Sequence, residues 1–157
     1  MRNKQKGFSL IELLVVVAII LIIAAIAIPN LMGARMSANE ASAVGSVRTL
    51  NTSCVTYSST YGTGFPAALA KLGPAAVASA AAADLIDPVL MSGTKSGYTI
   101  LYAPAAPDAD GLIDTYTINA NPSAPGQSGQ RYFYTDQTNV ITYALGAAAG
   151  PTDVPIS

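Results

Sequence analysis

The fold is decided near the start of the chain by Lys6-Gly7-Phe8-Ser9-Leu10-Ile11-Glu12-Leu13, where basic residues give way to an apolar run that continues to Ile28. As a helix, residues 8–28 would extend roughly 30 Å, about the thickness of a bilayer core. Ser9 and Glu12 are the only strongly polar residues of this run. It is expected to span a membrane once.

The basic residues of the N-terminus predict the orientation of this helix. Arg2, Lys4 and Lys6 precede it, and no acidic residue lies among them. Positive charge next to a membrane span favours the cytoplasmic side. We therefore expect a cytoplasmic N-terminus and an exported chain after Ile28.

Glu12 is costly where it stands, because a carboxylate in an apolar helix is normally matched to a specific partner. The segment around it resembles the start of a type IV prepilin, through the residues quoted above together with Val15-Val16-Val17-Ala18-Ile19 and Ala24-Ala25-Ile26-Ala27-Ile28-Pro29. The resemblance is dense over residues 1 to about 35.

The resemblance implies a processing site and an assembly contact. Residues 1–7 would be a leader that a prepilin peptidase removes by cutting between Gly7 and Phe8, and the new amine of Phe8 would be methylated. Glu12 would then pair with the Phe8 ammonium of a neighbouring subunit. A buried ion pair that loses one member costs about 3 to 5 kcal/mol, so the pair would hold subunits in axial register. The implied partners are further copies of the chain, the peptidase that also methylates, and an assembly platform in the inner membrane.

Two other interpretations of the apolar segment stay open. A secretory signal would be cut after a small-x-small pattern, which Ala25-Ile26-Ala27 supplies, although Glu12 and Pro29 are unusual there. An uncleaved membrane anchor explains the length of the segment, but it explains neither the Gly7-Phe8 junction nor Glu12.

Residues 29–61 are expected to continue the helix as an amphipathic second half. Pro29 lacks a backbone N–H and predicts a kink or local unwinding. The family often has a glycine where Leu21 stands here, so any melting in a filament should lie nearer Pro29 and Gly33. Apolar residues at helical spacing predict one face packed on a sheet: Val44, Val47, Leu50, Cys54, Val55, Tyr57 and Tyr61. Polar residues are expected on the opposite side: Ser42, Ser46, Thr49, Thr52, Ser53 and Thr56.

Residues 62–157 are expected to form a globular head, which completes an α+β pilin fold. The glycines of Gly62-Thr-Gly64 should end the helix. Alternating β-branched and aromatic residues predict four strands in an antiparallel meander, at 98–103, 116–120, 131–135 and 140–143.

Composition excludes several functions. Five basic and nine acidic residues follow Gly7, a net charge of −4, so no basic footprint for nucleic acid is present. The chain has no His, and Lys71 and Lys95, which could serve as a base instead, have no motif around them, so an enzyme is not expected. Cys54 is the single cysteine, which rules out the internal disulfide of many pilins and favours a buried apolar role.

The sequence has one weak metal candidate. Asp108, Asp110 and Asp114 lie within seven residues around Gly111, in partial likeness to a calcium loop. Secretion pseudopilins can hold calcium in the head, so the resemblance permits this site; a solvated acidic turn is the alternative. Asp84 and Asp87 are interpreted as caps beside Pro88.

The predicted function is that of a structural subunit that polymerises into a type IV pilus. A major pseudopilin of a type II secretion system is the alternative, and a minor tip pilin that acts as a binding module is a further one. The protein would span the inner membrane once, with its head periplasmic or outside, before it enters an extracellular pilus or a periplasmic pseudopilus.

Overall fold

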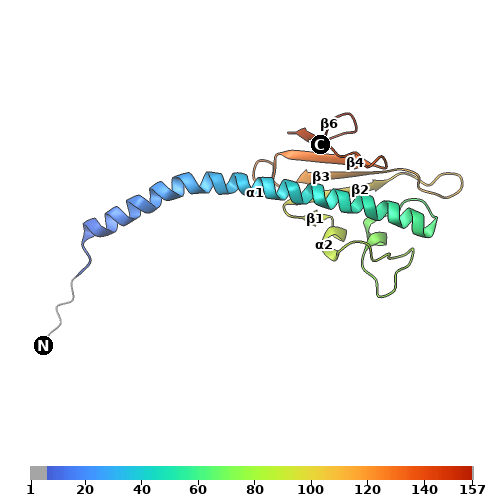
Figure 1. The fold of residues 1–157 in the computed structure, drawn as a ribbon, viewed down its shortest axis with the longest axis horizontal. Coiled ribbons are helices and arrows are strands. Elements are labelled where there is room, and N and C mark those ends of the chain that lie inside the picture. Colours follow the sequence, from blue (N-terminus) through green and yellow to red (C-terminus); the bar gives the residue numbers. More distant parts are fainter. Residues whose placement is uncertain (1–6, 157) are drawn as a thin grey trace. The chain divides into compact units, whose positions relative to one another are not determined.

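The structure, a computed structural model, describes residues 7–156, which form two units that divide after Arg35. Helix α1 (Leu10–Tyr61) supplies the first unit and opens the second. Figure 1 follows the chain from α1 into the strands. Arg2, Lys4 and Lys6 lie outside the described residues, so the orientation that they favour stays a prediction.

The first unit is helical almost throughout. Its large apolar side chains, from Phe8 to Met32, are exposed. Among residues 7–156, α1 is the one helix long and apolar enough to cross a membrane. The helix continues through Pro29, so the local unwinding predicted there is absent from the subunit. One missing N–H removes a single backbone hydrogen bond, and the helix on both sides of Pro29 keeps its own.

The second unit packs α1 on a sheet. After α1 come η1 (Leu69–Leu72) and α2 (Pro88–Met91), and then six strands: β1 (Thr94–Lys95), β2 (Tyr98–Pro104), β3 (Tyr116–Pro122), β4 (Arg131–Asp136), β5 (Thr142–Leu145) and β6 (Val154–Pro155). Each strand pairs antiparallel with the next one along the chain. The expected α+β architecture with an antiparallel meander is confirmed.

The four predicted strands correspond to β2, β3, β4 and β5, whereas the two edge strands of the sheet were not predicted. The first three lie within one or two residues of their expected ends, whereas the fourth begins at Thr142 instead of Val140. Strands β1 and β6 have two residues each and were not expected. Strands this short carry too little alternation to be recognised in a sequence.

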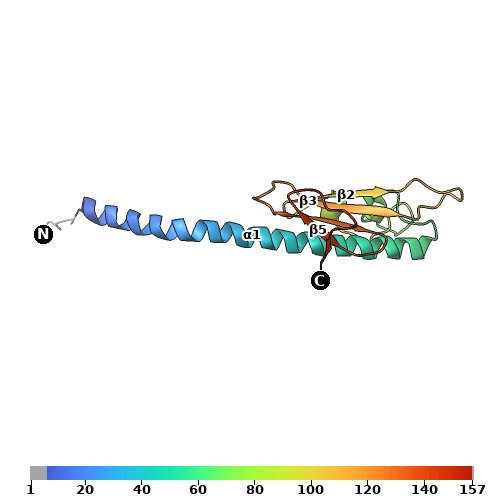
Figure 2. The ribbon, with the colours of Figure 1, turned by 90° about the horizontal axis from the view of Figure 1, so that it is seen from above.

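The core lies between the sheet and the part of α1 that belongs to the second unit (Figure 2). Val47, Leu50 and Cys54 are fully buried there, together with Tyr98 and Phe133 from the strands. The predicted apolar face of the helix was correct except for Val55, which is 43% exposed. Residues that contact the sheet therefore lie a little to one side of the expected stripe.

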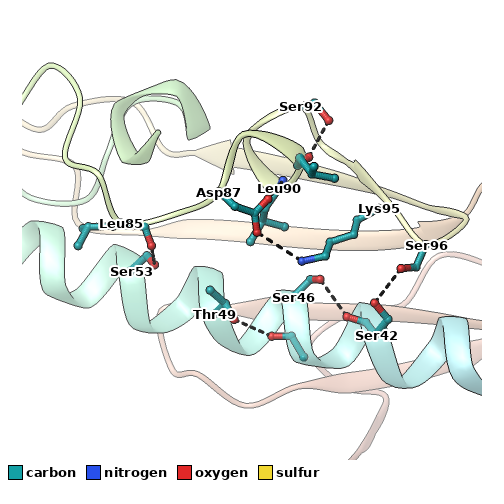
Figure 3. A network of polar contacts seen from close by, with 12 residues as sticks. Ser42, Ser46, Thr49, Ser53, Leu85, Asp87, Leu90, Ser92, Lys95 and Ser96 are labelled. Carbon is teal, nitrogen blue, oxygen red and sulfur yellow. Dashed lines mark hydrogen bonds and ion pairs between the residues drawn. The ribbon is translucent and has the colours of Figure 1, made fainter. Parts of the chain in front are cut away.

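Two serines assigned to the solvent side are instead buried. The hydroxyl of Ser46 donates to the carbonyl of Ser42, and the hydroxyl of Ser53 donates to the carbonyl of Leu85. Small hydroxyl side chains tolerate burial when their donor is satisfied. Figure 3 shows both serines facing the segment that carries Leu85, Asp87 and Lys95.

Candidate assembly site

The N-terminus of α1 carries the residues expected to act in processing and assembly. The amides of Glu12 and Leu13 donate to the carbonyl of Ser9, at 3.1 and 3.3 Å, so Ser9 is the residue that caps the helix. The Glu12 carboxylate turns back and accepts a hydrogen bond from the amide of Ser9, with Oε2 at 2.9 Å. Glu12 therefore has a local partner in the isolated subunit.

This contact was missed at the sequence level, although a signal for it was present. Ser9-x-x-Glu12 is the capping-box pattern, in which an acidic side chain three residues into the helix satisfies the amide of the cap residue. A carboxylate in the first turn also interacts favourably with the helix dipole. Only Oε2 is used, and Oε1 has no hydrogen-bond partner among residues 7–156.

Gly7 and Phe8 precede the helix and are exposed. A Cβ built on Gly7 would meet no atom of residues 7–156 within 4 Å, so the described fold does not require glycine there. Phe8 is 76% exposed. The peptide bond between them is therefore open to an approaching protein.

A second set of contacts fastens α1 to the sheet. Glu40, which is buried, accepts hydrogen bonds from the amides of Gln130 and Arg131 and, at 2.7 Å, from Nε of Arg131. One residue earlier, the Asn39 amide group donates to the carbonyl of Ser128. These contacts join the helix to the start of β4.

The environment of Glu40 favours its ionised form. Burial raises the pKa of the carboxyl, but the hydrogen bonds from Gln130 and Arg131 and the charge of Arg131 outweigh burial, and the pKa lies below its ordinary value of 4.5. Sequence reasoning did not single out Glu40, because its partners lie about 90 positions away and no local pattern points to them.

A buried polar cluster lies in the same interface between helix and sheet, closer to the C-terminal end of α1. The Asn51 amide donates to Oγ1 of Thr135 at 3.0 Å, and the Tyr116 hydroxyl donates to Oδ1 of Asn51 at 3.2 Å. Cys54 is fully buried, and burial raises the pKa of its thiol to about 12. This agrees with the expected apolar role for Cys54 and gives the thiol no reactive character.

The candidate calcium ligands do not converge. Oδ1 of Asp108 accepts the amides of Asp110 and Leu112, which closes a tight turn around Gly111. No group of three His, Cys, Asp or Glu side chains that could hold a metal lies in residues 7–156. Asp87 caps α2 by accepting the amide of Leu90, as expected, whereas Asp84 makes no capping contact in the described chain.

Similarities to known proteins extend along most of the chain. Residues 2–28 match the prokaryotic N-terminal methylation motif. The chain is 35% identical over 131 residues to the type IV major fimbrial protein FimA of Dichelobacter nodosus, which covers 76% of each protein. No solved structure shows significant similarity to the chain.

Two further similarities are confined to shorter stretches. The type IV wide pilus major component PilA4 of Thermus thermophilus is 65% identical over 40 residues, 26% of this chain and 30% of that protein. The type II secretion system core protein G of Escherichia coli is 42% identical over 45 residues, 29% of this chain and 31% of that protein.

Proposed function

The chain belongs to the type IV pilin family, and we propose that this structural subunit, once cut before Phe8, polymerises into the shaft of a type IV pilus. The observation that carries the proposal is the similarity to a major fimbrial protein over three quarters of both chains. An uncovered apolar helix with one carboxylate in its first turn supports it.

The apolar part of α1 needs a cover, because its exposed side chains are unfavourable in water. Before assembly, the inner membrane would provide it, with the N-terminus cytoplasmic and the head on the far side. After assembly, the same helices of neighbouring copies would provide it in the core of the fibre. An assembly platform in the inner membrane would move the apolar helix of each subunit from the membrane into the core of the fibre.

Processing would create the charge that completes the assembly contact. Hydrolysis between Gly7 and Phe8 by a prepilin peptidase consumes one water and leaves a free amine on Phe8, which is then methylated. The open surroundings of Gly7 suit this cut. The ammonium group of Phe8 then needs a counter-ion in apolar surroundings.

Glu12 would supply that counter-ion to the next subunit. Because Oε2 is bound to the Ser9 amide, Oε1 is the oxygen left to accept from a neighbouring Phe8. The intramolecular contact also holds the carboxylate close to the start of the helix. A group held in one orientation loses less entropy when it binds its partner.

Two measurements test this proposal: the N-terminal sequence of the mature protein and the yield of sheared surface fibres. Sequencing of the mature protein should begin at Phe8, and a start at Ile28 would establish the secretory alternative instead. Glu12→Ala should insert into the membrane normally but reduce sheared surface fibres at least tenfold. Ser9→Ala is the matched control, since it keeps the backbone amide that Glu12 binds, and it should leave fibres near the wild-type amount. Normal fibres from Glu12→Ala would refute the pairing.

A pseudopilin of a type II secretion system is the second candidate. The similarity to core protein G supports it, but that similarity covers 29% of the chain, whereas the similarity to the major fimbrial protein covers 76%. Deletion of the gene separates the two functions. If the deletion strain loses surface fibres but still exports proteins normally, the pilus is supported. If the wild type shows no surface fibres and the deletion strain fails to export another protein, the pseudopilus is supported.

A further inference from the structure

We propose that the face of α1 left open by the sheet binds the acidic loop of a second copy of the chain. The open face consists of five exposed residues, Arg48, Thr49, Thr52, Val55 and Thr56. The acidic loop is the connection between β2 and β3, residues 105–115. This inference rests on the proposed polymerisation and adds to it a specific contact between heads.

The open face is a ridge between two grooves, each of about 430 Å³. Arg48, Thr52 and Thr56 line both grooves. Asn139 closes one of them on the side of the β4–β5 connection, and Leu85 closes the other. With Val55 exposed at the ridge, the surface combines apolar area with one positive charge.

Arg48 lacks a counter-ion in its own subunit. No carboxylate of residues 7–156 lies within 4.0 Å of its guanidinium, whereas Arg131 is paired with Glu40 and Lys95 with Asp87. An exposed arginine with five donors suits an incoming carboxylate, which it can bind through two parallel hydrogen bonds.

The acidic loop has the complementary chemistry. Asp110 and Asp114 are exposed, and neither forms an ion pair with the described residues. Exposed small apolar residues precede them in Ala105-Ala106-Pro107. Lys71 borders the same cavity as Pro107 and Gly111, but no ion pair joins Lys71 to the loop in the described part of the chain.

The acidic loop is also already shaped for binding. Asp108 closes its tip, since its backbone amide donates to the carbonyl of Leu112 and its side chain accepts from Asp110 and Leu112. The Ala105 amide donates to the carbonyl of Thr115 at the base. A loop held by its own hydrogen bonds loses little freedom on docking.

The position of the acidic loop favours a second copy over its own helix. The loop projects past the strands at the end of the head where α1 finishes (Figures 1 and 2). Arg48 lies 13 residues before the last residue of α1, Tyr61, which is roughly 20 Å along the helix. In a polymer that stacks copies along the helix direction, the loop of one copy meets the open face of another.

A charge exchange tests the contact in fibres made from the full chain. Arg48→Glu and Asp110→Lys should each reduce the yield of sheared fibres at least threefold, since each places like charges together. The double variant Arg48→Glu/Asp110→Lys should recover at least half of the wild-type yield. Gln127→Lys, at another exposed position of the head, is the control for added charge and should not lower the yield.

Cysteine cross-linking identifies the occupant directly. Thr52→Cys and Asp110→Cys, co-expressed as separate chains, should form a disulfide-linked dimer in sheared fibres, and neither variant alone should form one. The native Cys54 is fully buried and should not contribute. Normal fibres without the mixed dimer, or a double variant no better than the single ones, would overturn this contact while the proposed function stands. A wild-type chain that never forms fibres would overturn both.

Discussion

Nε of Arg131 lies 2.7 Å from Oε2 of Glu40 and so joins the first residue of β4 to a helical residue 91 positions earlier. The same carboxylate accepts two backbone amides, so three donors depend on it. Among the described residues of α1 that precede Glu40, only Asn39 has a side-chain hydrogen bond to the sheet or its loops. Asn39 and Glu40 are thus the first residues of α1 whose side chains hydrogen-bond to the sheet or its loops in the described chain.

Removal of this carboxylate should loosen the head. Glu40→Ala leaves the amides of Gln130 and Arg131 without their acceptor, and hydrogen bonds to a charged group contribute about 1.5 to 3 kcal/mol each before solvent screening. Because Arg131 is partly exposed, we expect a loss of about 2 to 3 kcal/mol in the free energy of unfolding. Denaturant titration of the full chain in detergent, followed by tyrosine fluorescence, measures it. An unchanged midpoint would contradict this role.

Stability should fall on the acid side through the same residue. The pKa of Glu40 is lowered in the folded state from the ordinary 4.5, so its contribution is complete above pH 4.5 and is lost as the pH falls through the folded pKa. Glu40→Gln cannot titrate and should show a shallower acid dependence than the wild type between about pH 5 and 2. Parallel pH curves for the two proteins would show that Glu40 is not responsible. Asp87, whose pKa is lowered by the Leu90 amide, contributes equally to both curves.

Substitution in the buried polar cluster around Asn51 should lower the free energy of unfolding. Asn51→Leu leaves the hydroxyls of Tyr116 and Thr135 without their partner, and an unsatisfied buried polar group costs about 1 to 3 kcal/mol. The triple variant Asn51→Leu/Tyr116→Phe/Thr135→Val removes all three polar groups and should regain part of the loss. Denaturant midpoints compare the two. A triple variant less stable than the single one would argue against this account.

The Cys54 thiol should resist modification in the folded protein. It is fully buried, and its pKa of about 12 leaves almost no thiolate at neutral pH. Iodoacetamide should therefore label the protein only after denaturation, whereas Thr52→Cys on the open face should be labelled at once. Mass spectrometry after timed quenching gives both rates. Rapid labelling of native Cys54 would mean that the core opens readily.

Two glycines should respond to alanine in opposite directions. Gly64 has φ of +73°, and a Cβ there would lie 2.6 Å from backbone atoms of Ile113, so Gly64→Ala should destabilise the head by more than about 1 kcal/mol. Gly45 lies within α1 with open space around it, so Gly45→Ala should raise the free energy of unfolding by up to about 1 kcal/mol. Thermal unfolding of both variants tests the contrast. A stabilising Gly64→Ala would refute the strain argument.

The sequence predicted the elements of this fold better than their contacts. Strong local patterns placed the end of α1 at Tyr61 and the start of three strands at Tyr98, Tyr116 and Arg131. The precise rotation of the helix against the sheet does not follow from spacing alone, which is why Val55 was assigned to the core and Ser53 to solvent. Packing of the sheet decides that rotation, and it is a property of the whole head.

The candidate site shows the same division. The resemblance around Glu12 implies a role in assembly, which stays a prediction, whereas the contact of Glu12 with Ser9 became evident only from the positions of the two groups. Glu40 and Asn51 were not predicted, because their partners come from distant strands. The acidic loop was considered as a metal site from its composition, while the geometry of Asp108 indicates a turn.

The order of the strands has a consequence for how the head folds. Every strand pairs with its immediate neighbour in the chain, so each hairpin can close as soon as its second strand is available. Such local closure is fast and leaves few unpaired edges to aggregate. In the proposed function, the head would fold after translocation, while tethered to a membrane beside identical chains, and this rapid and sequential route would limit contacts between unfolded heads.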